Sequence, residues 1–150
     1  MMFMTAKVDP KKVFIVLAAL AALILGILWH FGGPKEDAAK VATNDDRVAY
    51  LKNLGWEVTV TPKETMEVRV PQEGDEVFRR YNELQKSQGF DLSKYAGKTV
   101  QRYVYQVNNY PGATEPVYAT LLIYKDQVIG GDVTNTSPGG TVRSLHRPSA

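Results

Sequence analysis

Apolar residues follow three different patterns along the chain, and each pattern predicts a different kind of element. The first is an unbroken apolar run over residues 13–31, nineteen positions without a formal charge. As a helix rising about 1.5 Å per residue, this run covers roughly 28 Å, which is close to the roughly 30 Å hydrocarbon core of a bilayer. The pattern therefore predicts one membrane-spanning helix, the predicted anchor, from Val13 to Phe31.

The second pattern is a helical spacing of apolar residues in two shorter segments. Residues 44–54 begin beside polar side chains that can cap free backbone N–H groups, and they end at Gly55. Residues 75–88 end in the same way at Gly89. Glycine is favoured in the left-handed conformation that terminates many helices. The sequence therefore predicts two amphipathic helices, each with one apolar stripe to bury.

The third pattern is alternation with a period of two, which is typical of strands. Residues 56–61 and 66–70 alternate on either side of a Pro-Lys turn, which predicts a hairpin with one buried face. A tight turn at Lys125 and Asp126 is predicted to join two later strands. In the second half of the chain the predicted strands are residues 98–108, 117–124 and 127–134.

Strand 117–124 is apolar on both sides, so it is either a central strand covered on both faces or a strand with an exposed patch. Because each helix offers one stripe, we expect an α+β domain in the order α-β-β-α-β-β-β. Two amphipathic helices would pack on a mainly antiparallel sheet. The sequence Gly130-Gly131-Asp132 predicts a bulge or a close backbone approach within the last strand.

Charged residues beside the predicted anchor indicate its orientation. Three lysines precede it, and basic residues favour the cytoplasmic side of a membrane. A cleaved signal peptide is the alternative, but such peptides have a shorter apolar region and small residues before the cleavage site. We therefore expect a single-pass protein of the cell membrane that contacts membrane lipid. Its expected parts are a cytoplasmic N-terminus (1–12), a transmembrane helix (13–31), a linker (32–43), an extracellular α+β domain (44–135) and a flexible tail (136–150).

Composition argues against several kinds of chemistry in this domain. The chain has no cysteine, and its two histidines, His30 and His146, lie outside residues 44–135. A catalytic triad or a histidine metal site needs a positioned imidazole, so no metal and no cofactor is expected. From Asn44 onward 13 basic residues balance 13 acidic residues, which leaves no electrostatic footprint for nucleic acid. We expect no enzyme, and a carboxylate-based hydrolase stays open as an alternative.

Tyrosines are the most suggestive candidates for binding. Six of the eight lie within residues 95–124, and tyrosines gather at interfaces because each has an apolar ring and a polar tip. Tyr110 and Asn109 lie in a predicted loop, where binding residues often collect, and Tyr118 and Tyr124 lie on the strand that follows. Two alternatives stay open. Strand tyrosines more often belong to a core, since aromatic residues are ordinary strand formers, and Tyr110 could serve only to close the loop over the sheet.

Three runs of sequence are similar to those of a known family. They are RVAYLKNLGWEV, then YNELQKSQGFDLSKYAGKTVQRYVYQVNNYPG, and then VIGGD. Over about residues 44–135 the chain resembles the membrane-anchored proteins of Gram-positive bacteria that share domain of unknown function 4830. The resemblance implies a single N-terminal span before one domain, and it brings no activity with it.

These observations favour a non-enzymatic binding or interaction module in the cell envelope. Its partner would be another envelope protein, a peptide or a cell-wall component, contacted through Tyr110 and the neighbouring aromatic residues. A second hypothesis is a membrane-tethered inhibitor or regulator of an envelope enzyme. In that case the loop of residues 108–116 would insert into the cleft of the enzyme.

Overall fold

The computed structural model of the chain describes residues 39–147. The predicted cytoplasmic N-terminus and the predicted anchor lie outside these residues. Within 39–147 no helix has both the length and the apolar character needed to cross a bilayer. In chain order the elements are α2 (Asn44–Asn53), β1 (Glu64–Arg69), α3 (Glu76–Ser87), the 3-10 helix η1 (Leu92–Tyr95), β2 (Thr99–Val107), β3 (Val117–Tyr124), β4 (Gln127–Asn135) and β5 (Val142–Arg143).

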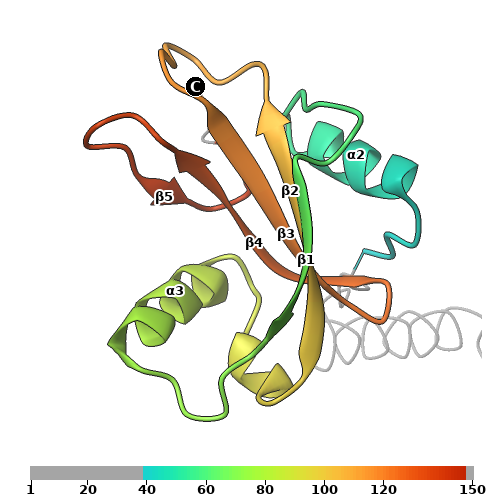
Figure 1. Cartoon of the computed structure of the whole chain (residues 1–150), viewed down its shortest axis with the longest axis vertical. Helices are drawn as coiled ribbons and strands as arrows, with labels where there is room; N and C mark the ends of the chain where they lie inside the picture. Colours follow the sequence, from blue (N-terminus) through green and yellow to red (C-terminus); the bar gives the residue numbers. More distant parts are fainter. Residues whose placement is uncertain (1–38, 148–150) are drawn as a thin grey trace, which may run out of the picture. The chain divides into compact units, whose positions relative to one another are not determined.

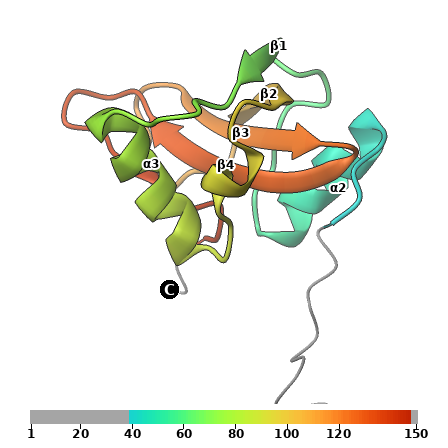
Figure 2. The same cartoon turned by 90° about the horizontal axis from the view of Figure 1, so that it is seen from below.

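The five strands form one sheet in the order β1-β2-β3-β4-β5, and every neighbouring pair is antiparallel (Figures 1 and 2). β3 therefore lies at the centre. The turn from β3 to β4 confirms the predicted tight connection, since Lys125 and Asp126 have φ values of 48° and 63°. Two consecutive left-handed residues match the right-handed twist of the strands that they join.

The side chains of the sheet alternate between two cores, one under each helix. On the side we call the α2 face, Leu51 and Trp56 pack with Tyr105 and Leu121, all at most 3% exposed. The opposite side, the α3 face, has a smaller core made of Val70, Leu92, Val100, Leu122 and Ile129. β3 contributes to both cores, which confirms that it is a central strand covered on both faces.

Both helices begin where the sequence predicts, because their first backbone N–H groups are capped. The Thr43 hydroxyl accepts a hydrogen bond from the Asp46 N–H at 3.2 Å, and the Asp46 carboxylate accepts from the Thr43 N–H at 2.9 Å. At α3 the Asp75 carboxylate accepts from the Phe78 N–H at 2.8 Å. Such caps satisfy groups that have no partner inside the helix. The predicted ranges agree with α2 and α3 to within one residue at each end.

The predicted hairpin of residues 56–61 with residues 66–70 is wrong. Val58 forms only an isolated bridge with Val107, and β1 pairs with β2 rather than with the segment before it. Both segments run antiparallel to β2 along the same edge, so the chain keeps its direction through Pro62 instead of reversing. The alternation correctly indicated a half-buried extended segment, but it carries no information about which strand lies beside it.

Residues at both ends of the predicted domain also pack into it. Val41, from the predicted linker 32–43, is 2% exposed, and its N–H donates to a carbonyl in the β3–β4 turn. In the predicted flexible tail 136–150, β5 joins the sheet and Leu145 is 1% exposed. The described parts of the predicted linker and of the predicted flexible tail therefore belong to the folded domain. Val41 and Leu145 both fill the core of the α2 face.

The predicted irregularity in β4 is confirmed. Leu122 pairs with Gly130, whereas Ile123 pairs with Val128, so Ile129 is an extra residue on β4. A bulge of this kind strengthens the local twist of a sheet. It lies next to the two glycines that suggested it.

Gly131→Ala should destabilise the domain by about 3 kcal/mol, because there is no room for a methyl group. A Cβ at Gly131 would meet the Thr120 carbonyl oxygen and would lie 2.6 Å from Leu145 Cδ1. Gly112→Ala is the matched control. Its φ of 68° is strained for alanine, but no atom lies within 4 Å of the new Cβ. We therefore expect a destabilisation of only about 1 kcal/mol. Urea unfolding of both variants measures the difference. Equal losses would contradict the steric explanation.

Candidate functional site

Two side chains hold the base of the β2–β3 loop, residues 108–116. The Asn109 amide accepts a hydrogen bond from one backbone N–H and donates to one carbonyl of residues 55–57, both at 2.9 Å. The Tyr110 ring stacks on Trp56, with 5.8 Å between ring centroids and 6° between ring planes. These contacts close the loop over the core of the α2 face. Binding through this loop stays a prediction.

The predicted tyrosines do not form one surface. Tyr118 and Tyr124 are six residues apart along β3, which separates them by roughly 20 Å at about 3.3 Å per residue. Tyr124 packs against the core of the α3 face and meets the edge of Tyr95, with ring centroids 5.4 Å apart. Tyr110 packs against the core of the opposite face. A single aromatic binding patch made of all of them is therefore not present.

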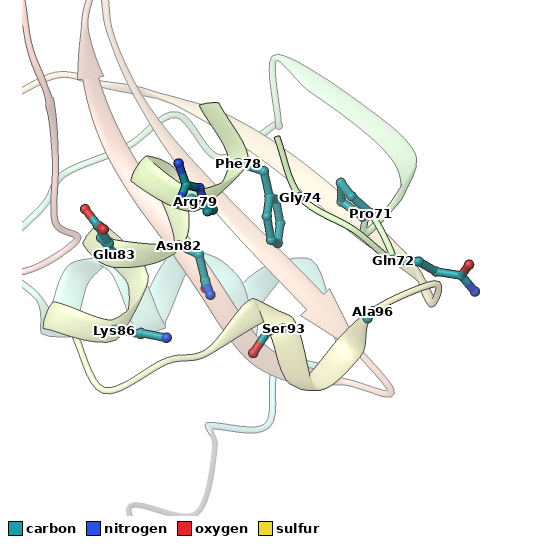
Figure 3. Close-up of a pocket in the computed structure, with 10 residues that line it drawn as sticks. All are labelled: Pro71, Gln72, Gly74, Phe78, Arg79, Asn82, Glu83, Lys86, Ser93 and Ala96. Atoms are coloured by element: carbon teal, nitrogen blue, oxygen red, sulfur yellow. The ribbon is translucent and has the colours of Figure 1, made fainter. Parts of the chain in front are cut away.

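A pocket of about 350 Å³ lies between α3, η1 and the segment that precedes α3 (Figure 3). The volume is within the range of roughly 300–1,000 Å³ that is usual for small-ligand sites. The wall combines apolar and polar groups from three segments. Its apolar part includes Pro71, Phe78 and Ala96, and its polar part includes Asn82, Lys86 and Ser93.

The apolar wall of the pocket depends on a glycine. The Asp75 cap fixes the start of α3, and the Phe78 ring then points into the space between α3 and η1 (Figure 3). A Cβ at Gly74 would clash with Phe78 Cδ1 and Cε1. The ring therefore lies directly over the backbone of Gly74, where any other residue would displace it.

The polar end of the pocket is held by Asn82, which is only 6% exposed. Its Oδ1 accepts from the Leu92 N–H at 2.8 Å, and its Nδ2 donates to the Asp91 carboxylate at 3.1 Å. Hydrogen bonds from Ser93 and Asn82, with the nearby Lys86 charge, lower the pKa of Asp91 to about 2. Asn82 thus joins α3 to η1 and keeps an ionised carboxylate beside the pocket.

Charged side chains of both signs surround the pocket. Arg79 and Lys86 lie two turns apart on α3, and Glu83 lies between them. In Figure 3, Lys86 and Ser93 approach each other from facing segments, whereas Glu83 points away from the pocket. The arrangement suits a ligand with an apolar part against Phe78 and a polar part near Lys86.

A buried carboxylate links α3 to the sheet. Asp132 is 6% exposed and accepts hydrogen bonds from the Tyr81 hydroxyl at 2.6 Å and the Thr134 hydroxyl at 2.8 Å. Burial raises the pKa of Asp132, while these two bonds and the Arg102 charge oppose the rise. None of the groups that influence its ionisation is a second carboxylate. In residues 39–147 no three potential metal ligands cluster together.

Sequence reasoning missed both the pocket and the Asp132 link, although a signal for each was present. Asn82 and Gln85 occupy positions on the same stripe of α3 as Phe78 and Tyr81, and both polar residues are buried. Polar groups on the apolar stripe of a helix need specific partners. That pattern could have directed attention to this face of α3.

The fold and the pocket define a small α+β domain in which one five-stranded antiparallel sheet lies between two helices. The chain belongs to the family described as a domain of unknown function (DUF4830), which matches residues 50–133. The match confirms the resemblance to this family over residues 50–133, and the membrane anchor stays a prediction. No curated protein and no solved structure matches the chain.

Tyr110→Phe should leave the free energy of unfolding unchanged within about 0.5 kcal/mol. The ring keeps its stack on Trp56, and the hydroxyl has no hydrogen bond within the described chain. Tyr110→Ala should lower the free energy by about 2 kcal/mol, because apolar contact and the ring pair are both lost. Chemical denaturation of the two variants measures this. An alanine variant as stable as the phenylalanine variant would refute the structural role.

Asp132 should make the domain less stable as the pH rises above 3.8, the ordinary pKa of its side chain. Burial raises its pKa in the native state, so the unfolded chain loses the proton first and unfolding is favoured as the pH increases toward the native pKa. Asp132→Asn should remove this slope. Urea unfolding of both proteins across a pH series tests it. The opposite result would be a free energy of unfolding that rises with pH in the wild type relative to Asp132→Asn. It would show that the hydrogen bonds from Tyr81 and Thr134 affect the pKa of Asp132 more than burial does.

Proposed function

We propose that the domain is a non-enzymatic binding module of the cell envelope and that the pocket beside α3 is its binding site. The observation that supports this proposal is a concave site of about 350 Å³ with an apolar wall and a polar end. Ligand sites usually combine these two features, because apolar surface supplies binding energy and a few polar groups fix orientation.

The construction of the pocket supports the same proposal. Gly74 leaves the space that the Phe78 ring occupies, and the hydrogen bonds of Asn82 hold η1 against α3. A site built from packed and bonded residues loses little conformational freedom when a ligand enters. The pocket is therefore suited to binding without rearrangement of the sheet.

The location of the module in the envelope rests on the predicted anchor, residues 13–31, and on the basic residues before it. Under this proposal the domain lies outside the cell, and its ligand is an envelope protein, a peptide or a cell-wall component. A ligand that places an apolar group on Phe78 and a polar group near Lys86 fits the lining of the pocket.

A second candidate function is a membrane-tethered regulator of an envelope enzyme that acts through the β2–β3 loop. One observation favours it: residues 111–116 are exposed above a base that Asn109 and Tyr110 hold in place. Loops carried by a rigid scaffold commonly supply binding residues. The two candidates place the partner on different parts of the domain, so they can be distinguished.

Site-specific photo-crosslinking of the full-length protein in native membranes tests both candidates. A photoreactive residue replaces Gln72 at the pocket, Glu115 in the loop, or Lys52 at the exposed end of α2 as a control. We expect an adduct from position 72 that is at least about fivefold above the control, detected by mass spectrometry of the crosslinked protein.

Adding Gly74→Ala should reduce the adduct at position 72 and leave the signal at position 115 unchanged. The new Cβ displaces Phe78 on the α3 face, whereas the base of the loop packs on the α2 face. An adduct at position 115 alone would favour the regulator and reject the pocket. Equal, low signals at all three positions would reject both candidates.

A further inference from the structure

Arg47 lies in α2 and is only 9% exposed, although it carries a charge. Its Nε donates to the Tyr105 hydroxyl at 2.9 Å, and this hydroxyl donates to Asn44 Oδ1 at 2.7 Å. Its guanidinium carbon lies 3.8 Å from the centre of the Tyr103 ring. The side chain is therefore fixed on the α2 face by two tyrosines of β2.

No carboxylate neutralises this cation within the described chain. The ion pairs there are Arg80 with Glu76 and Arg102 with Glu64, and both are on other elements. Asp46 is the adjacent residue, but its carboxylate is engaged by Thr43, and Arg47 is only a lesser cause of its lowered pKa. Arginine stays protonated in proteins, and a buried charge without a partner is costly.

The terminal nitrogens of the Arg47 guanidinium have no hydrogen-bond partner within the described residues. Nε is occupied by Tyr105, and no hydrogen bond of Nη1 or Nη2 occurs in residues 39–147. Among these residues Gln85 Nε2 is the one fully enclosed side-chain nitrogen or oxygen without a partner. Neither terminal nitrogen of Arg47 is therefore fully enclosed, although most of the side chain is buried.

We propose that Arg47 is the centre of an oxyanion-binding site that accepts a carboxylate or phosphate group through Nη1 and Nη2. A guanidinium binds such groups with two parallel hydrogen bonds. Tyr103 and Tyr105 hold its plane in advance, so little side-chain freedom is lost on binding. The site is on the opposite face from the pocket and does not depend on it.

Nuclear magnetic resonance of the full-length protein in detergent micelles tests the site. Inorganic phosphate and acetate are titrated separately against chloride at constant ionic strength, and the arginine Nε–Hε signals are followed. We expect a saturable shift of the Arg47 signal and none for Arg80, an exposed arginine of α3. If the shift saturates at a lower concentration of phosphate than of acetate, the ligand carries a phosphate group. If it saturates at a lower concentration of acetate, the ligand carries a carboxylate.

Arg47→Lys should weaken anion binding at least about tenfold, because an ammonium cannot form the bidentate pair, and Arg80→Lys should not. Backbone signals near Tyr103 report binding in both variants. Linear, equal shifts of Arg47 and Arg80 in the wild-type protein would overturn the proposal, and that titration is decisive even if Arg47→Lys does not fold. The crosslinking experiment tests the pocket on the other face of the sheet, so the failure of either proposal leaves the other one untouched.

Discussion

β3 lies at the centre of the sheet with apolar side chains in both cores, so water must be excluded from both of its faces. A single helix cannot meet this requirement, and the chain places α2 on one face and α3 on the other. Each helix has one side to bury, which matches the single stripe seen in its sequence. The burial of β3 therefore determines where both helices lie.

α3 covers β3 with buried polar side chains as well as apolar ones. Specific hydrogen bonds offset most of the cost of burying them, although Gln85 Nε2 has no partner within residues 39–147. Gln85 is fully buried, and its Oε1 accepts from the Gly131 N–H at 2.8 Å. Gln88 donates to the Gly131 carbonyl and accepts from the Leu145 N–H. A buried polar group left without partners costs about 1–3 kcal/mol. These bonds explain why the C-terminal segment packs into the domain: it supplies the Leu145 N–H to Gln88 and the Leu145 side chain to the opposite core.

Local patterns predicted the parts of the fold that depend on local physics. The caps at Thr43 and Asp75, the turn at Lys125-Asp126 and the bulge beside Gly130 each follow from a few neighbouring residues. The neighbour of residues 56–61 could not be predicted in this way, because periodicity reports burial and not pairing. Leu145 was missed for a related reason. One apolar residue in a polar segment has no period, and its burial depends on Trp56, whose Nε1 donates to the Leu145 carbonyl at 2.6 Å.

The candidate sites were harder to predict than the fold because their residues come together only in three dimensions. Asn82 and Ser93 meet at the pocket across the turn between α3 and η1, and Arg47 meets Tyr103 and Tyr105 across more than fifty residues of sequence. In both places a polar side chain stands where a regular amphipathic pattern would have an apolar one. The two candidate sites lie on different faces of the sheet, so any coupling between them would pass through β3 and its neighbours. Energetic coupling of that kind is carried by packed elements that have two discrete arrangements, and β3 is the strand that contributes to both cores.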